Sequence, residues 1–223
     1  MAVDLRLYAL LDPEHAGGHD IADLARQVAE GGATLVQLRD KRGSTRAMVE
    51  RARAIKAALA PLKVPLLIND RVDVALAAGA DGAHVGQDDL AAEDARRLLG
   101  FDAIIGLSIK TVAQAEAAPI DRIDYVGIGG VFATSSKDNP DPPIGTQGLR
   151  AITEALRGRA AKIPIVAIAG IDHRNAADVV AAGADGVAVI SALSTAADPA
   201  AAARELRAIV DRALAERRRG ARR

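Results

Sequence analysis

Short β-rich runs alternate with stretches of helical periodicity along almost the whole chain. Strands are predicted at residues 5–11, 34–39, 66–68, 81–85, 103–107, 124–128, 165–168 and 187–190. Helices are predicted at residues 20–30, 44–60, 72–78, 90–99, 111–117, 149–158, 175–181 and 199–216. A crossover helix returns the chain to the same edge of a sheet, so the strands that it joins are parallel. The alternation therefore predicts a parallel α/β fold.

Eight strand-helix units in 223 residues are what a single (β/α)₈ TIM barrel requires. We assign residues 1–223 to one domain, with the barrel over about 5–215 and a basic, frayed tail at 217–223. The sequence Ala-Gly-Ala-Asp-Gly at 78–82 recurs at 182–186, four units later, which is half a barrel. A doubly wound open sheet is the competing architecture, but the Gly-x-Gly-x-x-Gly turn expected after its first strand is missing.

Composition argues against several functional classes. Lys and Arg balance Asp and Glu at 29 each, whereas a nucleic-acid protein normally shows a basic excess. Two Phe, two Tyr and no Trp leave little aromatic surface on which bases could stack. The absence of Cys excludes disulfides, a thiolate nucleophile and a sulfur-ligated zinc site. We therefore expect a cytoplasmic protein without nucleic-acid or membrane partners, and the sequence is compatible with a homo-oligomer.

Polar side chains follow the predicted strands. Parallel strands place these side chains together at the C-terminal face of a barrel, where active sites lie. After the second strand, Gln37, Arg39 and Lys41 share one side of an extended chain, which suits a polyanion. Asp70 follows the third strand, and the two aspartates Asp88 and Asp89 follow the fourth. Neighbouring strands are about 4.8 Å apart, so Asp70 and one aspartate of this pair are predicted to share a divalent cation.

The remaining strand ends carry further candidates for binding. They are Asn69, Ser108, the run Thr134, Ser135, Ser136 and Lys137, then Gly170, Ile190 and Ser191. Backbone amides after the seventh and eighth strands usually form the phosphate site of this fold.

Six motifs in order match a known family. They are Gln-Leu-Arg-Asp-Lys at 37–41, Ile-Asn-Asp at 68–70, His-Val-Gly-Gln-Asp-Asp at 84–89, Gly-Leu-Ser at 106–108, Tyr-Val-Gly-Ile-Gly with Thr-Ser-Ser-Lys within 125–137, and Gly-Val-Ala-Val-Ile-Ser at 186–191. Together they resemble the thiamine phosphate synthase family over about residues 5–195. The resemblance implies a transferase of thiamine biosynthesis, which joins hydroxymethylpyrimidine diphosphate to hydroxyethylthiazole phosphate and releases pyrophosphate.

The resemblance also implies roles for individual residues. The positions implied for the pyrimidine diphosphate are Gln37, Arg39, Lys41, Asn69, Ser108 and Lys137, and Asp40 of the same motif is also expected to bind substrate. Among them Arg39, Lys41, Ser108 and Lys137 are the implied catalytic residues, while Asp70 and Asp89 are the implied Mg²⁺ ligands. The positions implied for the thiazole phosphate are Thr134, Ser135, Ser136, Gly170, Ile190 and Ser191. Three positions depart from the family's usual residues, with Ala133 in place of proline, Ala169 in place of glycine and Lys110 in place of histidine.

Structural alternatives exist for each candidate taken alone. Asp70 and Asp89 are also typical helix caps, and Arg39 and Lys41 are typical of a solvated surface. His84 lies within a predicted strand, where a packed, hydrogen-bonded histidine is expected rather than a catalyst. Two alternative functions remain, a thiazole tautomerase of the same fold and a phosphate-binding barrel without turnover.

Overall fold

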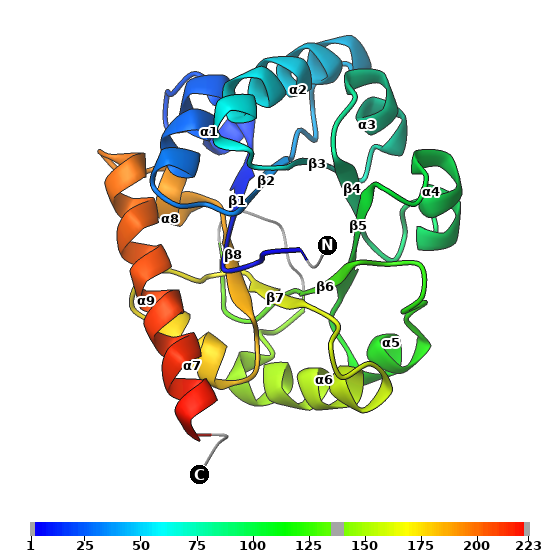
Figure 1. Ribbon diagram of the computed structural model, residues 1–223, viewed down its shortest axis with the longest axis vertical. Helices are drawn as coiled ribbons and strands as arrows, with labels where there is room; N and C mark the ends of the chain where they lie inside the picture. Colours follow the sequence, from blue (N-terminus) through cyan, green and yellow to red (C-terminus); the bar gives the residue numbers. More distant parts are fainter. Residues whose placement is uncertain (1–2, 135–140, 221–223) are drawn as a thin grey trace.

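A closed barrel of eight parallel strands forms the centre of the molecule in the computed structural model, which describes residues 3–134 and 141–220 (Figure 1). The strands are β1 (Leu7–Leu11), β2 (Leu35–Leu38), β3 (Leu66–Asn69), β4 (Gly82–Val85), β5 (Ile104–Ile109), β6 (Tyr125–Ile128), β7 (Ile165–Ile168) and β8 (Gly186–Val189). Each strand pairs in parallel with the next, and β1 pairs with β8, which closes the barrel. The predicted TIM barrel is confirmed.

Helices surround the barrel on its outside (Figure 1). They are α1 (Ile21–Glu30), α2 (Thr45–Leu59), α3 (Val72–Ala78), α4 (Ala92–Leu99), α5 (Val112–Ala117), α6 (Gly145–Arg159), α7 (Ala176–Ala181), α8 (Ser191–Ser194) and α9 (Pro199–Gly220), with short 3₁₀ turns η1 (Pro13–His15) and η2 (Ala60–Leu62). No helix in the described part of the chain is long and apolar enough to cross a membrane.

Side chains alternate along the strands between two buried clusters. Leu7, Ala9 and Leu11 of β1 pack in the large cluster between strands and helices. Tyr8 and Leu10 of the same strand belong to a smaller cluster inside the barrel. This is the period of two expected for a strand. It directs every second residue of a strand toward the interior below the barrel mouth.

Several elements differ from the sequence-based prediction. Helix α6 begins at Gly145 rather than at Leu149, and the four-residue helix α8 was not predicted. Strand β5 continues to Ile109, so that Ser108 lies within the strand instead of after it. Helix α9 continues to Gly220.

The prediction of a frayed tail is wrong for residues 217–220. Arg217 lies in α9, donates hydrogen bonds to the carbonyl oxygens of Val180 and Ala184 at 2.9 and 2.7 Å, and forms an ion pair with Asp185. These bonds anchor the end of the last helix to α7 and to the residues just before β8. Residues 221–223 of the predicted tail lie outside the described residues.

A repeated ion pair holds the start of the barrel together. The residue before β4, β6 and β8 is an aspartate whose carboxylate accepts from the first or second amide of the preceding strand; the three are Asp81, Asp124 and Asp185. Each also pairs with a cation from the preceding even-numbered helix, namely Lys56, Arg96 and Arg157. The Ala-Gly-Ala-Asp-Gly repeat contains two of these aspartates, so its function is structural.

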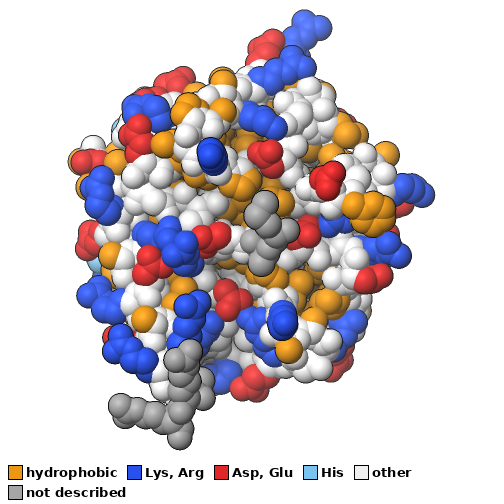
Figure 2. All heavy atoms as spheres, viewed as in Figure 1, with side chains coloured by type: hydrophobic (Ala, Val, Ile, Leu, Met, Phe, Trp, Pro, Cys, Tyr) orange, Lys and Arg blue, Asp and Glu red, His pale blue; other side chains and the backbone are white. Residues whose placement is uncertain are grey.

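On the face shown in Figure 2, acidic and basic side chains are interspersed.

Candidate functional site

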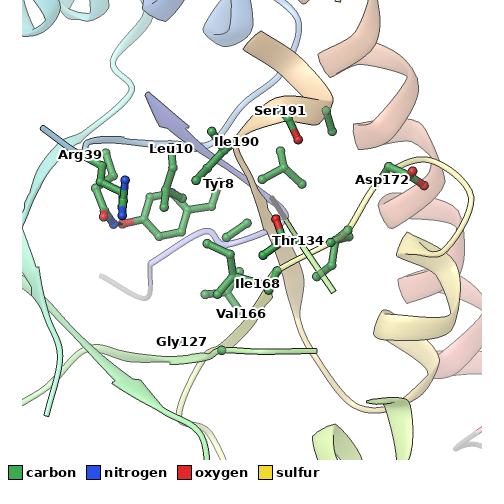
Figure 3. A pocket seen from close by; sticks show the side chains of 18 of the residues that line it. Tyr8, Leu10, Arg39, Gly127, Thr134, Val166, Ile168, Asp172, Ile190 and Ser191 are labelled. Atoms are coloured by element: carbon green, nitrogen blue, oxygen red, sulfur yellow. Dashed lines mark hydrogen bonds between the residues drawn. The ribbon is translucent and has the colours of Figure 1, made fainter. Parts of the chain in front are cut away.

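A cavity of about 540 Å³ opens at the C-terminal ends of the strands (Figure 3). Its walls bring together eight of the predicted site residues: Gln37, Arg39, Asn69, Ser108, Thr134, Gly170, Ile190 and Ser191. Tyr8, Leu10, Val166 and Ile168 add an apolar and aromatic surface from inside the barrel. The cavity thus combines a wall suited to a flat ring with polar groups at its rim.

Arg39 is held in place by a residue that sequence reasoning missed. Asp12 follows β1, is fully buried and forms an ion pair with the Arg39 guanidinium. The Asp12 carboxylate also accepts from the amide of Glu14 at 3.0 Å. A guanidinium has five N–H donors in a planar fork. One side of Arg39 is therefore bound by Asp12, and the guanidinium is fixed at the wall of the cavity.

Lys41, Asp70 and Asp89 lie together beside the cavity. The Lys41 ammonium forms an ion pair with the Asp70 carboxylate. Burial, followed by the neighbouring Asp70 carboxyl, raises the pKa of Asp89 above its usual range. The Asp70 backbone has a φ of 60°, and its amide donates to the carbonyl oxygen of His84 at 2.8 Å, which ties the end of β3 to β4. The register thus places the two carboxyl groups side by side.

Neither aspartate caps the helix that follows it. Helix α3 has no side-chain cap, and neither does α4. Asp89 accepts from the Gly86 amide at 2.8 Å and so closes the turn after β4. The capping alternative is wrong for both residues. Asp89, rather than Asp88, is the member of the pair that interacts with Asp70.

The donor set at this place fits Mg²⁺. Within residues 3–134 and 141–220, no group of three or more His, Cys, Asp or Glu side chains is arranged to hold a metal ion. Mg²⁺ is commonly bound by only one or two carboxylates together with substrate phosphates and water. Asp70 and Asp89 supply two adjacent carboxylates. The Lys41 ammonium already pairs with one of them, so this place stabilises positive charge. The two carboxylates therefore match the charge of Mg²⁺ and the number of protein carboxylates that usually bind it.

Asp40 has a different position from the one predicted. Its side chain is only 6% exposed and pairs with Arg51 at 2.5 Å. It also accepts from the amides of Arg42 and Gly43, at 3.2 and 2.7 Å. Asp40 does not line the cavity. Its carboxylate shapes the loop that carries Lys41, so we leave it out of the proposed substrate contacts.

The opposite wall is built from the loops after β6, β7 and β8. Phe132 donates its amide to the carbonyl oxygen of Ala169 at 3.0 Å, so the loops after β6 and β7 run side by side. A Cβ at Gly170 would lie 2.3 Å from the carbonyl oxygen of Ala133, which explains a glycine there. Ser191 begins α8, and Thr134 lies across the cavity from it (Figure 3). Ser135, Ser136 and Lys137 lie outside the described residues.

Departures from the family pattern also fall at this wall. Ala133, Ala169 and Lys110 all line the cavity. Ala169 has a φ of 97°, a region that favours glycine. The Lys110 ammonium lies 3.3 Å from the carboxylate of Asp141.

Buried polar side chains inside the barrel were only partly predicted. His84 is 8% exposed and bonds through both ring nitrogens, to Tyr125 and Ser108, which confirms the prediction of a packed, hydrogen-bonded histidine. The contact of Tyr8 and Tyr125 was missed. The two tyrosines of the sequence, each inside a predicted strand, were the available signal.

Comparisons with known proteins agree on one family. The family model described as thiamine monophosphate synthase matches residues 7–193. A thiamine-phosphate synthase of Agrobacterium fabrum is 52% identical over 96% of this chain and 98% of the relative. One of Moorella thermoacetica is 49% identical over 93% of this chain and 96% of the relative. The solved structure of a thiamine phosphate pyrophosphorylase from Pyrococcus furiosus superimposes with a TM-score of 0.82 at 37% identity, covering 95% of this chain and 98% of that one.

Proposed function

The chain belongs to the thiamine monophosphate synthase family and is a thiamine-phosphate synthase, and from this premise we propose how its barrel mouth binds and joins two phosphorylated substrates. The pyrimidine diphosphate binds at the ends of β2 to β5, with its ring in the cavity and its diphosphate toward Arg39 and Lys41. The thiazole phosphate binds at the loops after β6, β7 and β8. Thr134, Gly170, Ile190 and Ser191 hold its phosphate, together with Ser135 and Ser136 of the sequence.

The diphosphate end needs positive charge, since departure of pyrophosphate builds negative charge on its oxygens. Asp70 and Asp89 would hold the Mg²⁺, which when bound neutralises part of this charge. Arg39 donates to the phosphate oxygens in a geometry that Asp12 fixes beforehand. Lys41 and Lys137 add positive charge. The Asn69 amide and the Ser108 hydroxyl bind the pyrimidine substrate, as does Gln37.

No side chain acts as a nucleophile in this proposal. The bond from the pyrimidine's methylene carbon to the diphosphate oxygen breaks, the electron pair leaves with pyrophosphate, and the thiazole nitrogen forms the new bond with its lone pair. The protein aligns this nitrogen with the methylene carbon and excludes water from the apolar part of the cavity. Such positioning is itself a large part of catalysis for a two-substrate reaction.

One observation carries the proposal, namely that two adjacent carboxylates and two cations gather beside a cavity whose inner surface is apolar and aromatic. A thiazole tautomerase would have no need of these groups. Purified protein with Mg²⁺ and both substrates should release thiamine phosphate and pyrophosphate in equal amounts, and a chelator should abolish both. Isomerisation of a thiazole substrate alone, without coupling, would instead support the tautomerase. Binding without any turnover would support the non-catalytic barrel.

A cytoplasmic location and self-association into a homo-oligomer are further proposals. Both are compatible with a transferase of thiamine biosynthesis. Cell fractionation tests the first, and light scattering of the purified protein tests the second.

A further inference from the structure

Five polar side chains form one continuous hydrogen-bonded chain through the interior of the barrel. In order they are Gln37 of β2, Tyr8 of β1, Tyr125 of β6, His84 of β4 and Ser108 of β5. The Tyr8 and Tyr125 hydroxyls are 2.9 Å apart, Tyr125 lies 2.7 Å from His84 Nδ1, and His84 Nε2 lies 2.7 Å from Ser108 Oγ. We call these five side chains the relay. Its two ends, Gln37 and Ser108, both line the cavity.

Two glycines in the barrel strands leave the space that the relay occupies. In the sheet register, Gly106 lies between His84 on one side and Tyr125 on the other. A Cβ at Gly106 would lie 2.3 Å from the Tyr125 hydroxyl oxygen and 2.4 Å from His84 Nδ1. A Cβ at Gly127 would lie 3.0 Å from the His84 ring. Barrel interiors are usually filled by branched apolar residues, so this polar core with two glycines is a specialised arrangement.

The first member of the relay sets the direction of all its hydrogen bonds. An amide nitrogen can only donate, so the Tyr8 hydroxyl accepts from Gln37 Nε2. Tyr8 then donates its only proton to Tyr125, and Tyr125 donates its proton to His84 Nδ1. His84 must carry its own proton on Nε2, which donates to Ser108 Oγ. In this order the Ser108 hydroxyl accepts from His84 and can donate its own proton into the cavity.

Both phenols keep the single proton that this order needs. Burial raises the pKa of Tyr8 and of Tyr125 far above that of a free tyrosine. At the other end of the relay, Gln37 Oε1 is buried and has no partner among the described residues. These bonds give the relay one direction, and Gln37 Oε1 at its end keeps its capacity to accept a hydrogen bond.

We propose that Tyr8, Tyr125 and His84 are positioning residues, which order the relay so that Ser108 presents a hydrogen-bond donor, and Gln37 an acceptor, to the ring of the pyrimidine substrate. The inference rests on the proposed function, because it names the ring as the ligand. A ring nitrogen accepts one hydrogen bond and matches Ser108, and an exocyclic amine donates and matches Gln37.

A direct test inverts the relay from its far end. In Gln37→Glu the carboxylate can only accept, so every bond along the relay must reverse, and His84 must move its proton from Nε2 to Nδ1. Nitrogen NMR of the ligand-free protein at about pH 9, where a glutamate is normally ionised, reports the tautomer, and a His84→Asn sample assigns the signal. We expect Nε2–H in the wild type and Nδ1–H in Gln37→Glu. The same tautomer in both proteins, or Nδ1–H in the wild type, overturns the proposal.

A second test asks whether Tyr125 acts through Ser108. Calorimetry with the unphosphorylated hydroxymethylpyrimidine should show about a tenfold loss of affinity in Ser108→Ala, the size of one hydrogen bond. Tyr125→Phe should weaken binding severalfold alone and not at all in the Ser108→Ala background. Equal losses in both backgrounds would show a role independent of Ser108 and overturn the proposal.

Matched controls separate this role from general stability. Thr153 in α6 is buried and its hydroxyl has no partner among the described residues, so Thr153→Val removes a buried hydroxyl outside the relay and should leave pyrimidine affinity unchanged. Affinity for pyrophosphate with Mg²⁺ should be unchanged in Ser108→Ala. Failure of the proposed function would appear as a wild type that makes no thiamine phosphate, whereas the tautomer measurement uses no substrate and tests the relay alone.

Discussion

At the residue scale, two strand ends at the barrel mouth hold a non-glycine residue at positive φ. Asp70 follows β3 with a φ of 60°, and Ala169 follows β7 with a φ of 97°. Such conformations cost energy and persist only where the surrounding structure enforces them. At Asp70 the conformation is accompanied by a hydrogen bond to β4 that places its carboxylate beside Asp89. The Ala169 side chain is a methyl group and places no ligand group, so we attribute the strained φ of Ala169 to the turn alone.

Ala169→Gly should therefore stabilise the protein. Relief of the strained φ is worth about 1–2 kcal/mol, and the greater freedom of glycine in the unfolded chain offsets up to about 1 kcal/mol of it. We expect a gain of up to about 1 kcal/mol in urea unfolding. Ala167→Gly in β7, which is buried and not at positive φ, is the control and should lower the free energy of unfolding. A loss of stability in Ala169→Gly equal to that of the control would contradict the account.

The buried phenols predict a loss of stability at alkaline pH. Burial raises the pKa of Tyr8 in the folded state, whereas the unfolded chain ionises near pH 10. Above about pH 10 the unfolded state loses this proton first, so the free energy of unfolding falls by up to about 1.4 kcal/mol per pH unit. Below that pH the phenol contributes no pH dependence. Tyr8→Phe should have a shallower slope between about pH 10 and 11, and parallel curves for the two proteins would refute this.

At the element scale, the start of the barrel and its mouth are stabilised by different means. The mouth carries carboxylates and cations suited to ligands, whereas the start carries the repeated aspartate bonds described for β4, β6 and β8. Arg96 is the cation that pairs with the aspartate before β6. Its guanidinium is nearly buried, pairs with Asp124 at 2.6 Å and donates to the carbonyl oxygens of Gly100, Ala103 and Arg122.

Arg96→Ala should lower the free energy of unfolding by about 2–3 kcal/mol, because it leaves Asp124 and several carbonyl oxygens without their donor. The adjacent Arg97 is 75% exposed, and its one ion pair among the described residues is with Asp94 on the same helix. Arg97→Ala should cost about 0.5 kcal/mol or less. Denaturant unfolding of both variants checks the difference, with kcat as a second readout that should stay unchanged. Equal costs for the two arginines would contradict this interpretation.

Sequence patterns predicted the regular elements well, and they failed where local chemistry is ambiguous. Helix α6 was placed four residues late because its first turn contains Gly145 and Gly148, which are poor helix formers. Helix α8 is one turn long and has no period to detect. Eight of the predicted site residues line the cavity, because they lie near or just after the C-terminal ends of strands. Asp12 and the Tyr8–Tyr125 contact were missed because pairing across the barrel depends on register, and 117 positions separate the tyrosines.

At the scale of the whole molecule, barrel closure links the first strand to the last. Strand β1 pairs with β8, and Arg217 near the end of α9 bonds to the residues just before β8. If any set of consecutive strands unfolded from the closed barrel, the remaining strands would expose two unpaired edges. This supports the proposal that residues 1–223 form one domain.

One domain of this kind predicts a single cooperative unfolding transition. Fluorescence of the two tyrosines and far-ultraviolet circular dichroism should give coincident curves in denaturant. Two separated transitions would indicate that part of the chain folds independently.

The central claim is that Asp70 and Asp89 hold the Mg²⁺ that serves the leaving pyrophosphate, and single-turnover pyrophosphate release as a function of Mg²⁺ tests it most directly. We expect Asp89→Asn to lower the rate by at least about 100-fold and to raise the Mg²⁺ concentration needed for half-maximal rate. Asp88→Asn, one residue away, should behave like the wild type. Release that is independent of Mg²⁺, or a loss in Asp88→Asn with full activity in Asp89→Asn, would contradict the account.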